Sequence, residues 1–207
     1  MNVSNPLSIP LVFHPIYSQL DLPDRHRFPV EIYQAIYDRL TSLGVPTSQF
    51  HQPHALTPVQ LARVYSPEYV NALSRGELES KAMRRIGFPW SAQLIERSLT
   101  AVAGTVLASS LALEHGKALN LTGGYHHAFA NFGSGFCLFN DLYLAALNML
   151  QTPTINKVLV FDCDVHQGDG TAKLASNNPK VFTVSIHGEK NFPHRKQISN
   201  LDFPLAK

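Results

Sequence analysis

Residues 158–170, VLVFDCDVHQGDG, constrain the fold and the chemistry of this chain more than any other stretch. Val158–Phe161 are apolar without alternation, which is typical of a strand buried on both faces of a sheet. Asp162, Asp164 and His166 follow at every second position, so a strand that continued through them would carry all three on one face. Carboxylates and an imidazole at the carboxyl end of a parallel strand favour a metal site.

Asp164 and His166 are the first candidates for metal ligands, because zinc takes nitrogen and oxygen donors and a catalytic zinc keeps one position open for water. The alternative is an ordinary surface pair after a strand. Asp162 and Asp164 would repel each other when buried unless a cation or a donor lay between them, which favours the metal. Two residues do not identify which metal it is.

A second polar stretch, Gly123–Asp141 (GGYHHAFANFGSGFCLFND), carries the adjacent pair His126–His127. Histidine is a natural general base near neutral pH, and a carboxylate commonly holds its other ring nitrogen. Asp162 and Asp169 are the carboxylates that can do this. A pair of ligands, or one core and one surface histidine, are equally compatible with the bare pair.

Three single residues receive simpler interpretations. Cys137 has apolar neighbours that raise the pKa of a thiol, so we expect it to be inert rather than nucleophilic. We expect both Cys137 and Cys163 to be buried, reduced thiols. His26 lies in a loop rich in proline and charge, and we expect it to be a surface histidine.

Helical periodicity, caps and short apolar runs predict alternating strands and helices, hence a parallel α/β sheet whose strand ends carry the polar clusters. Strands are expected at 8–14, 118–121, 157–161 and 181–187, and helices at 29–43, 57–64, 66–73, 90–115, 140–150 and 171–175. Small residues in the longest helix predict close packing against a sheet or another helix. The segment 122–136 is long for a loop, and such loops are usually functional.

Composition predicts one soluble domain over residues 1–207, with 44% apolar and 15% charged residues. The net charge of +2 is too small to favour nucleic acid or an anionic membrane as partner. We find no signal peptide and no apolar run long enough to span a bilayer, so we expect a cytoplasmic protein. The oligomeric state stays open.

Three motifs in this order, GGYHHA, GFCLFND and DCDVHQGDG, resemble the histone deacetylase family of the arginase-like superfamily. The segments HPIYSQ, HRFP and RRIGFPW are most similar to its class IV branch and bacterial relatives. The resemblance implies a parallel sheet with flanking helices in three layers. It also implies that residues 1–207 form the N-terminal portion of one deacetylase domain, incomplete at the C-terminus.

The resemblance further implies a role for individual residues. It makes Asp164 and His166 two of three zinc ligands, and His127 the general base beside His126. It puts Asp169 behind His127 and Asp162 behind His126. The remaining implied residues are the walls of an acyl-lysine tunnel (Gly135, Phe136 and, opposite, Phe192) and a structural potassium site (Ser185 and Ile186 with Asp162, Asp164 and His166).

The implied reaction is zinc-assisted hydrolysis of an acyl-lysine side chain on a protein, or of a small acetylated amine; the acyl group stays open. The family's third zinc ligand, an Asp, and its oxyanion-stabilising Tyr lie downstream of the matching segments, and Glu189 and Asp202 are the only late carboxylates here. We therefore expect this chain alone to be weakly active or inactive. An inactive relative of the same fold is one alternative. An arginase-like ureohydrolase with two manganese ions is disfavoured, because Gly168 stands where those enzymes resemble Asp-x-His-x-Asp.

Overall fold

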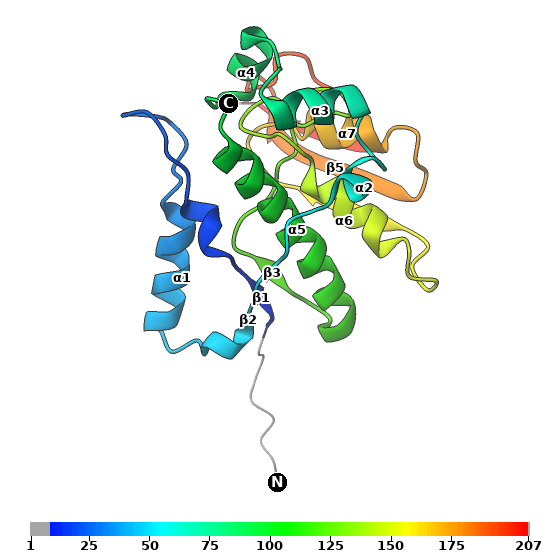
Figure 1. Ribbon diagram of the computed structural model, residues 1–207. Helices are drawn as coiled ribbons and strands as arrows, with labels where there is room; N and C mark the ends of the chain where they lie inside the picture. The colour runs from blue at the N-terminus through cyan, green and yellow to red at the C-terminus, as the bar shows by residue number, and fades with distance from the viewer. Residues whose placement is uncertain (1–8, 207) are drawn as a thin grey trace.

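The computed structural model describes residues 9–206, which form two three-stranded parallel sheets with helices packed against them (Figure 1). The first sheet has the order β2-β1-β3 and the second the order β4-β5-β6. The strands are β1 Leu11–Val12, β2 Phe50–His51, β3 Leu119–Asn120, β4 Val158–Asp162, β5 Val181–Gly188 and β6 Leu201–Leu205. The predicted fold class is confirmed, although the strands of the described residues form two sheets where one was expected. The strand expected at 8–14 is reduced to β1, and Ser8 lies outside the described residues.

Helix α5 (Ala92–His115) runs through the centre of the molecule and matches its prediction closely. The Ser91 side chain accepts a hydrogen bond from the Leu94 N–H at 3.0 Å, and Gly116 ends the helix in the left-handed conformation. A Cβ at Gly104 would overlap the Tyr17 hydroxyl and the Asn120 side chain. The small residues of α5 therefore allow the close approach that their pattern predicts.

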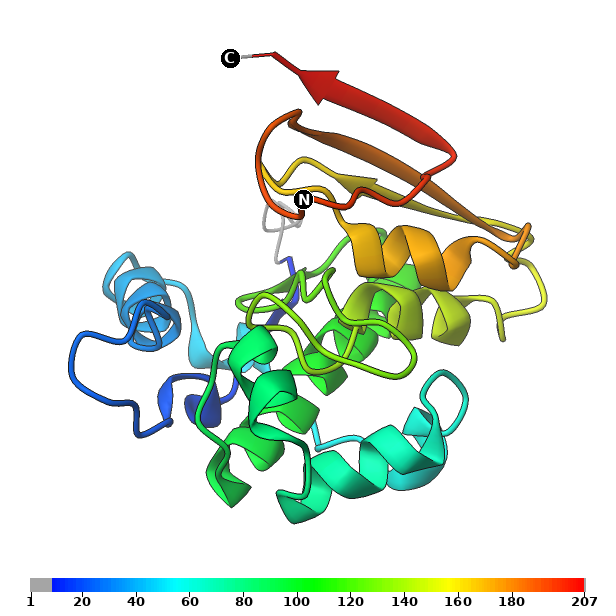
Figure 2. The same cartoon turned by 90° about the horizontal axis from the view of Figure 1, so that it is seen from above.

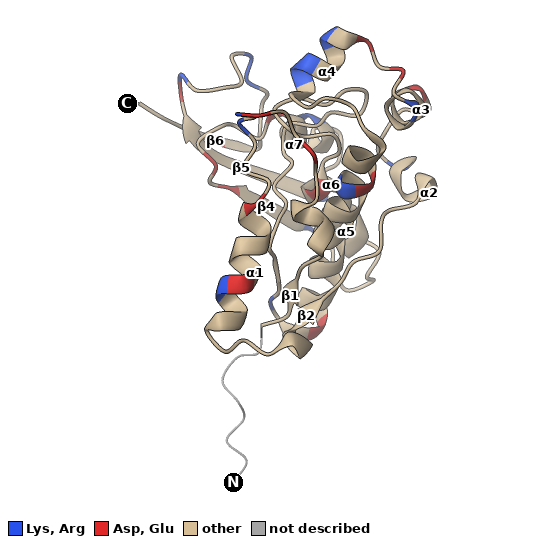
Figure 3. Ribbon diagram, turned by 60° about the vertical axis from the view of Figure 1, so that its left-hand side comes forward, with Lys and Arg blue, Asp and Glu red and all other residues tan. Residues whose placement is uncertain are grey.

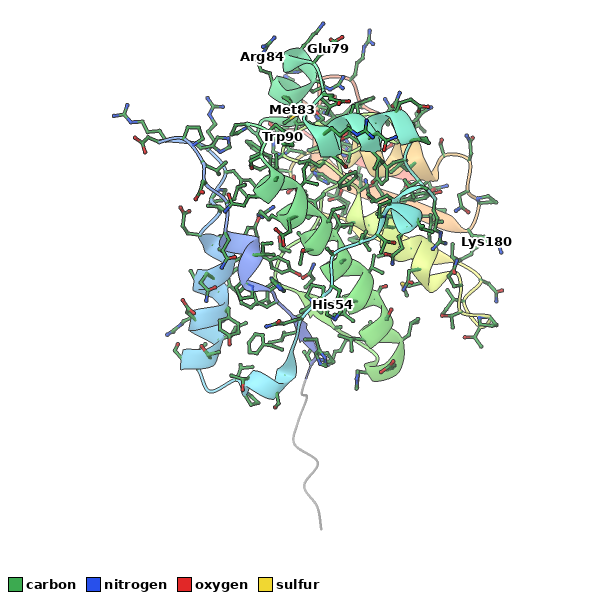
Figure 4. All side chains as sticks on the ribbon, in the orientation of Figure 1. His54, Glu79, Met83, Arg84, Trp90 and Lys180 are labelled. Atoms are coloured by element: carbon green, nitrogen blue, oxygen red, sulfur yellow. The ribbon has the colours of Figure 1, made fainter. Side chains whose placement is uncertain are left out.

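The remaining helices are α1 Ile32–Ser42, α2 Pro58–Leu61, α3 Pro67–Arg75, α4 Ser80–Ile86, α6 Asp141–Met149 and α7 Asp169–Ala175, with 3-10 turns η1 Pro15–Ser18 and η2 Thr47–Gln49. Thr57 and Gln60 form a reciprocal capping box, and α2 ends three residues earlier than expected. Trp90, labelled in Figure 4, donates a hydrogen bond from Nε1 to the Leu73 carbonyl at 2.7 Å and packs on Gly76. This contact joins the end of α3 to the segment that enters α5.

The two faces of the β4-β5-β6 sheet differ in what covers them. Val160 and Val181 are buried against α6 and α7 through Ala146 and Ala175, and Figure 2 shows both helices on this face. In a parallel pair the partnered residues share a face, so the register places alternate residues of all three strands on the opposite face. Val184 on this face is buried, but six large apolar side chains on the same face are 38–58% exposed: Leu159, Phe161, Phe182, Leu201, Phe203 and Leu205. Of the three expected layers, the described residues thus supply the sheet and the helices on one side of it.

Two expectations for single side chains are wrong. Cys163 is exposed, because β4 ends at Asp162 and the chain leaves the sheet before the thiol. His26 is half-buried: its Nε2 lies 2.9 Å from the Gly87 carbonyl oxygen, and its ring stacks on Phe88. The loop that carries His26 folds back onto an aromatic cluster, which its polar composition did not indicate.

Charged residues of both signs are interspersed over the ribbon in Figure 3, in keeping with the small net charge. Within residues 9–206 no helix combines the length and the apolar character that crossing a membrane requires.

The burial of α5 residues predicts how much each contributes to the stability of the fold. Leu94 has no exposed surface, whereas Leu113 on the same helix is 39% exposed. We expect Leu94→Ala to lower the free energy of unfolding by about 2–5 kcal/mol, because truncation leaves a cavity in the core. We expect Leu113→Ala to cost about 0.5 kcal/mol, as surface substitutions do. Urea unfolding followed by circular dichroism measures both, and equal losses would contradict this placement of the core.

Candidate active site

The carboxyl end of β4 is shaped by two consecutive turns in which an Asp side chain accepts a backbone hydrogen bond. Asp162 Oδ1 accepts from the Asp164 N–H at 2.9 Å, and Asp164 Oδ1 accepts from the His166 N–H at 2.8 Å. Because β4 ends at Asp162, the strand does not continue through Asp164 and His166. The turns direct Asp162 inward and leave Asp164 and His166 half-exposed, with His166 Nδ1 3.1 Å from Asp164 Oδ1.

Both histidines of the adjacent pair are buried, and each is held by its own carboxylate. His126 Nδ1 lies 2.6 Å from Asp162 Oδ2, and His127 Nδ1 lies 2.7 Å from Asp169 Oδ1. An ionised carboxylate can only accept a hydrogen bond, so Nδ1 carries the proton in each ring. Nε2 is then the ring nitrogen that can accept a hydrogen bond or a proton from another group. The two ring centroids are 4.0 Å apart. Sequence reasoning had named both carboxylates, and the structure brings all four side chains together.

Two glycines let the 158–170 stretch approach the histidine loop this closely. A Cβ at Gly168 would collide with the Asp162 carboxylate and approach the His126 ring. A Cβ at Gly170 would collide with the backbone oxygens of His126 and Ala128. The glycines of the motif are therefore needed for the contact between the two segments.

The two imidazoles differ in the direction of their pKa shifts. Burial lowers the pKa of His126, but the hydrogen bond and charge of Asp162 outweigh it, and the net shift is upward. Burial also lowers the pKa of His127, and with the charge of His126 beside it this outweighs Asp169, so the net shift is downward. The two shifts make His126 the more readily protonated ring of the pair.

A cavity of about 520 Å³ opens over these histidines, and both Asp164 and His166 line it. Phe192 stands edge-on to His127 with ring centroids 4.8 Å apart. A Cβ at Gly135 would lie 2.7 Å from His127 Cδ2, so the bare backbone at this position forms the facing wall together with Phe136. All three residues expected to form the tunnel therefore line the cavity.

The lining of the cavity also contains residues that sequence reasoning missed: Arg27, Phe28 and Tyr33. Helical periodicity assigned Tyr33 to a helix face, and only the resemblance of HRFP to a family motif could have drawn attention to the other two. Cys137 lines the cavity as well. Burial strongly raises the pKa of its thiol, which supports the expectation that it is inert.

Asp202 and Ser185, which follow the 158–170 stretch in the sequence, make hydrogen bonds to neighbouring protein groups. Asp202 accepts hydrogen bonds from Gln167 Nε2 at 2.8 Å and from the Ser199 N–H at 2.9 Å, so both carboxylate oxygens are engaged. Ser185 is buried next to Asp162 in the strand register, and its hydroxyl lies 3.0 Å from His187 Nδ1. The potassium site expected at Ser185 and Ile186 stays a prediction.

The pair Asp164 and His166 fits two positions of a tetrahedral zinc site. Zinc–nitrogen and zinc–oxygen bonds of about 2.0–2.1 Å at the tetrahedral angle place two ligand atoms about 3.3 Å apart, close to the 3.1 Å between His166 Nδ1 and Asp164 Oδ1. Among residues 9–206 no group of three or more His, Cys, Asp or Glu side chains converges on one metal position.

Comparison with known families identifies the class of protein. The histone deacetylase domain matches residues 26–202, so the chain belongs to the histone deacetylase family. An uncharacterized protein of Picosynechococcus sp. is 46% identical over 97% of this chain, and Acetoin utilization protein AcuC of Bacillus subtilis is 30% identical over 90% of it. The chain spans 67% and 51% of the lengths of these two proteins.

Solved structures agree on the fold. An HDAC homologue from Aquifex aeolicus superposes with a TM-score of 0.77 at 22% identity, over 96% of this chain and 59% of that one. An HDAC homologue complexed with SAHA gives a TM-score of 0.78 at the same identity and coverage. At this level of identity the likeness shows the fold alone.

The surroundings of the two His–Asp pairs predict pKa shifts of opposite direction for His126 and His127. In the metal-free chain we expect the His126 ring to titrate above the ordinary pKa of 6.5 and the His127 ring below it. Asp162→Asn removes the charge that raises the pKa of His126, so that pKa should fall. A pH series of imidazole Cε1–H NMR signals measures both rings. Identical titration of the two rings in the wild-type chain would contradict the difference in their surroundings.

The raised pKa of His126 also determines how the stability of the fold should change with pH. Because the folded-state pKa of His126 is raised, its pairing with Asp162 contributes stability below the unfolded pKa, and this contribution is lost as the pH rises through the folded pKa. Asp162→Asn should therefore cost more stability in mildly acidic buffer than in alkaline buffer.

Proposed function

We propose that this chain carries the proton-handling residues and two metal ligands of a zinc-dependent amidohydrolase that removes acyl groups from amines. The observation that carries the proposal is the convergence of two buried His–Asp pairs with Asp164 and His166 at one cavity. A zinc ion held by Asp164 and His166 would polarise the acyl carbonyl and lower the pKa of a bound water towards about 7.

His127 is the general base of the proposed reaction. Asp169 fixes its Nδ1–H, so the free Nε2 faces away from the carboxylate and can accept a proton from water. Its lowered pKa keeps the ring neutral at physiological pH, as a base must be. His126, whose pKa is raised, is the better candidate to hold a proton and to stabilise negative charge as the amide carbon becomes tetrahedral.

The walls of the cavity support an extended, mostly apolar substrate that ends in an amide. Phe136 and Phe192, with the bare backbone at Gly135, would grip the alkyl chain of an acyl-lysine, on a protein or in a small acetylated amine. The small net charge gives no reason to add nucleic acid as a partner. A cytoplasmic location and a structural potassium ion at Ser185 and Ile186 belong to the same proposal.

The metal part of the proposal predicts a specific zinc dependence. We expect the 207-residue chain to bind zinc in isothermal titration calorimetry, and Asp164→Asn to weaken this binding at least ~10-fold, because a charged ligand becomes a neutral amide. Glu189→Gln removes one exposed carboxylate that contacts neither ligand and serves as the matched control. Equal weakening by both substitutions would mean that zinc binds by overall charge.

The catalytic part predicts a dependence on His127. With zinc and an acetyl-lysine peptide we expect slow release of acetate, reduced by about 10²–10⁴ in His127→Ala because general-base catalysis typically contributes this much. His115→Ala, which changes a half-exposed histidine at the end of α5, is the control and should leave the rate unchanged. Zinc binding without any hydrolysis would favour an inactive relative of the fold, and hydrolysis that survives His127→Ala would exclude His127 as the base.

A further inference from the structure

Two adjacent residues at the start of α6, Asn140 and Asp141, have no exposed surface and lie behind the histidine loop. The Asp141 carboxylate accepts three hydrogen bonds. Oδ1 takes the Tyr125 N–H at 2.7 Å, and Oδ2 takes the Gly124 N–H at 3.0 Å and the Thr105 hydroxyl at 2.6 Å. Asp141 thus holds the two backbone amides that come immediately before His126.

Asn140 contacts the backbone that follows the two histidines, on the other side from the amides bound by Asp141. Its Oδ1 accepts from the Tyr143 N–H at 2.9 Å and caps α6. Its Nδ2 donates to the Ala128 carbonyl at 3.4 Å and to the Thr171 hydroxyl at 2.9 Å. Ala128 follows the histidine pair directly, and Thr171 lies two residues after Asp169.

The hydrogen bonds of the loop itself complete this arrangement. The Thr171 N–H donates to the His126 carbonyl at 3.0 Å, and the His126 N–H donates to the Gly124 carbonyl at 2.8 Å. The segment 124–128 is therefore fixed on both sides of the histidines by α6 and α7. Neither Asn140 nor Asp141 lines the cavity, so neither is placed to touch a substrate.

We propose that the pair Asn140–Asp141 is a positioning clamp that sets the ring positions of His126 and His127 for the reaction proposed above, on which this inference rests. Asp141 is its main member, because a carboxylate can accept from two amides and a hydroxyl at once. An amide offers one oxygen, and whichever way it is turned, its NH₂ faces the Gly124 N–H or the Tyr125 N–H. Asp141→Asn therefore releases one anchoring bond in a side chain of nearly the same shape.

A purely structural role for Asp141 is the competing explanation. Asp141 also lies in the first turn of α6, where negative charge stabilises a helix, and its bond to Thr105 ties α6 to α5. Asn148 offers a matched comparison, because its Nδ2 donates to Ser110 Oγ at 3.0 Å and ties the same two helices at the far end of α6. Asn148→Ala breaks a helix–helix hydrogen bond without touching the histidine loop.

The test compares wild-type, Asp141→Asn and Asn148→Ala chains with zinc and an acetyl-lysine peptide. We expect Asp141→Asn to lower kcat about 10- to 100-fold with KM changed less than about twofold, because small displacements of catalytic groups cost rate rather than binding. Asn148→Ala should keep the wild-type kcat. Equal loss of kcat in both variants, or a change confined to KM, would overturn the clamp.

A second readout does not depend on activity. In the metal-free chain, Asp141→Asn should speed amide hydrogen exchange at Gly124 or Tyr125 and broaden the His126 and His127 Nδ1–H signals, whereas Asn148→Ala should do neither. Unchanged exchange at both amides would refute the clamp even if kcat falls.

If the wild-type chain hydrolyses nothing, the proposed function fails, and the exchange and Nδ1–H signals alone decide on the clamp. Should Asp141→Asn not fold, Thr105→Val, which removes one donor to Asp141, should produce the same NMR changes on a smaller scale.

Discussion

Two buried imidazole–carboxylate hydrogen bonds determine how the central part of this molecule is arranged. The partners of each pair are 36 and 42 residues apart in the sequence, so the strand end at Asp162 and the start of α7 at Asp169 must both reach the same loop. A buried polar group without a partner would cost several times what a typical hydrogen bond contributes. This requirement explains why glycine occupies positions 168 and 170, where any side chain would push the two segments apart.

The same pairing produces opposite pKa shifts in two adjacent residues, and the difference is one of surroundings. Asp162 holds His126 close, and the charges of Asp164 and Asp169 add to its effect. His127 has one carboxylate at its ring but also the positive charge of His126 nearby, so its burial prevails. The difference in proton affinity between the two rings therefore arises from geometry, without any difference in residue type.

Features set by local chemistry could be predicted from the sequence, and features set by distant contacts could not. Ser91 and Gly116 delimit α5 through caps that act within one turn, and the residues of both His–Asp pairs stood out by type and by motif. The course of the chain after Asp162 escaped prediction, because an Asp that accepts the N–H two residues on competes with the strand, and residue type does not decide the outcome. The two-residue strand at Phe50 has no periodicity to detect, and the place of Phe28 in the lining of the cavity depends on how a loop folds back.

The residues proposed to handle protons and those proposed to bind a metal are held in different ways. His126, His127 and Asp169 are almost fully buried, and hydrogen bonds to α6 and α7 fix the loop that carries the two histidines. Asp164 and His166, by contrast, are about half-exposed on a turn. Side chains that are buried and fully bonded are ordered by folding itself, because moving them would expose unsatisfied groups. Exposed side chains on a turn are ordered by whatever they bind. In this chain, folding therefore preorganises the His–Asp pairs, and a metal bound as proposed would have to order its own two ligands.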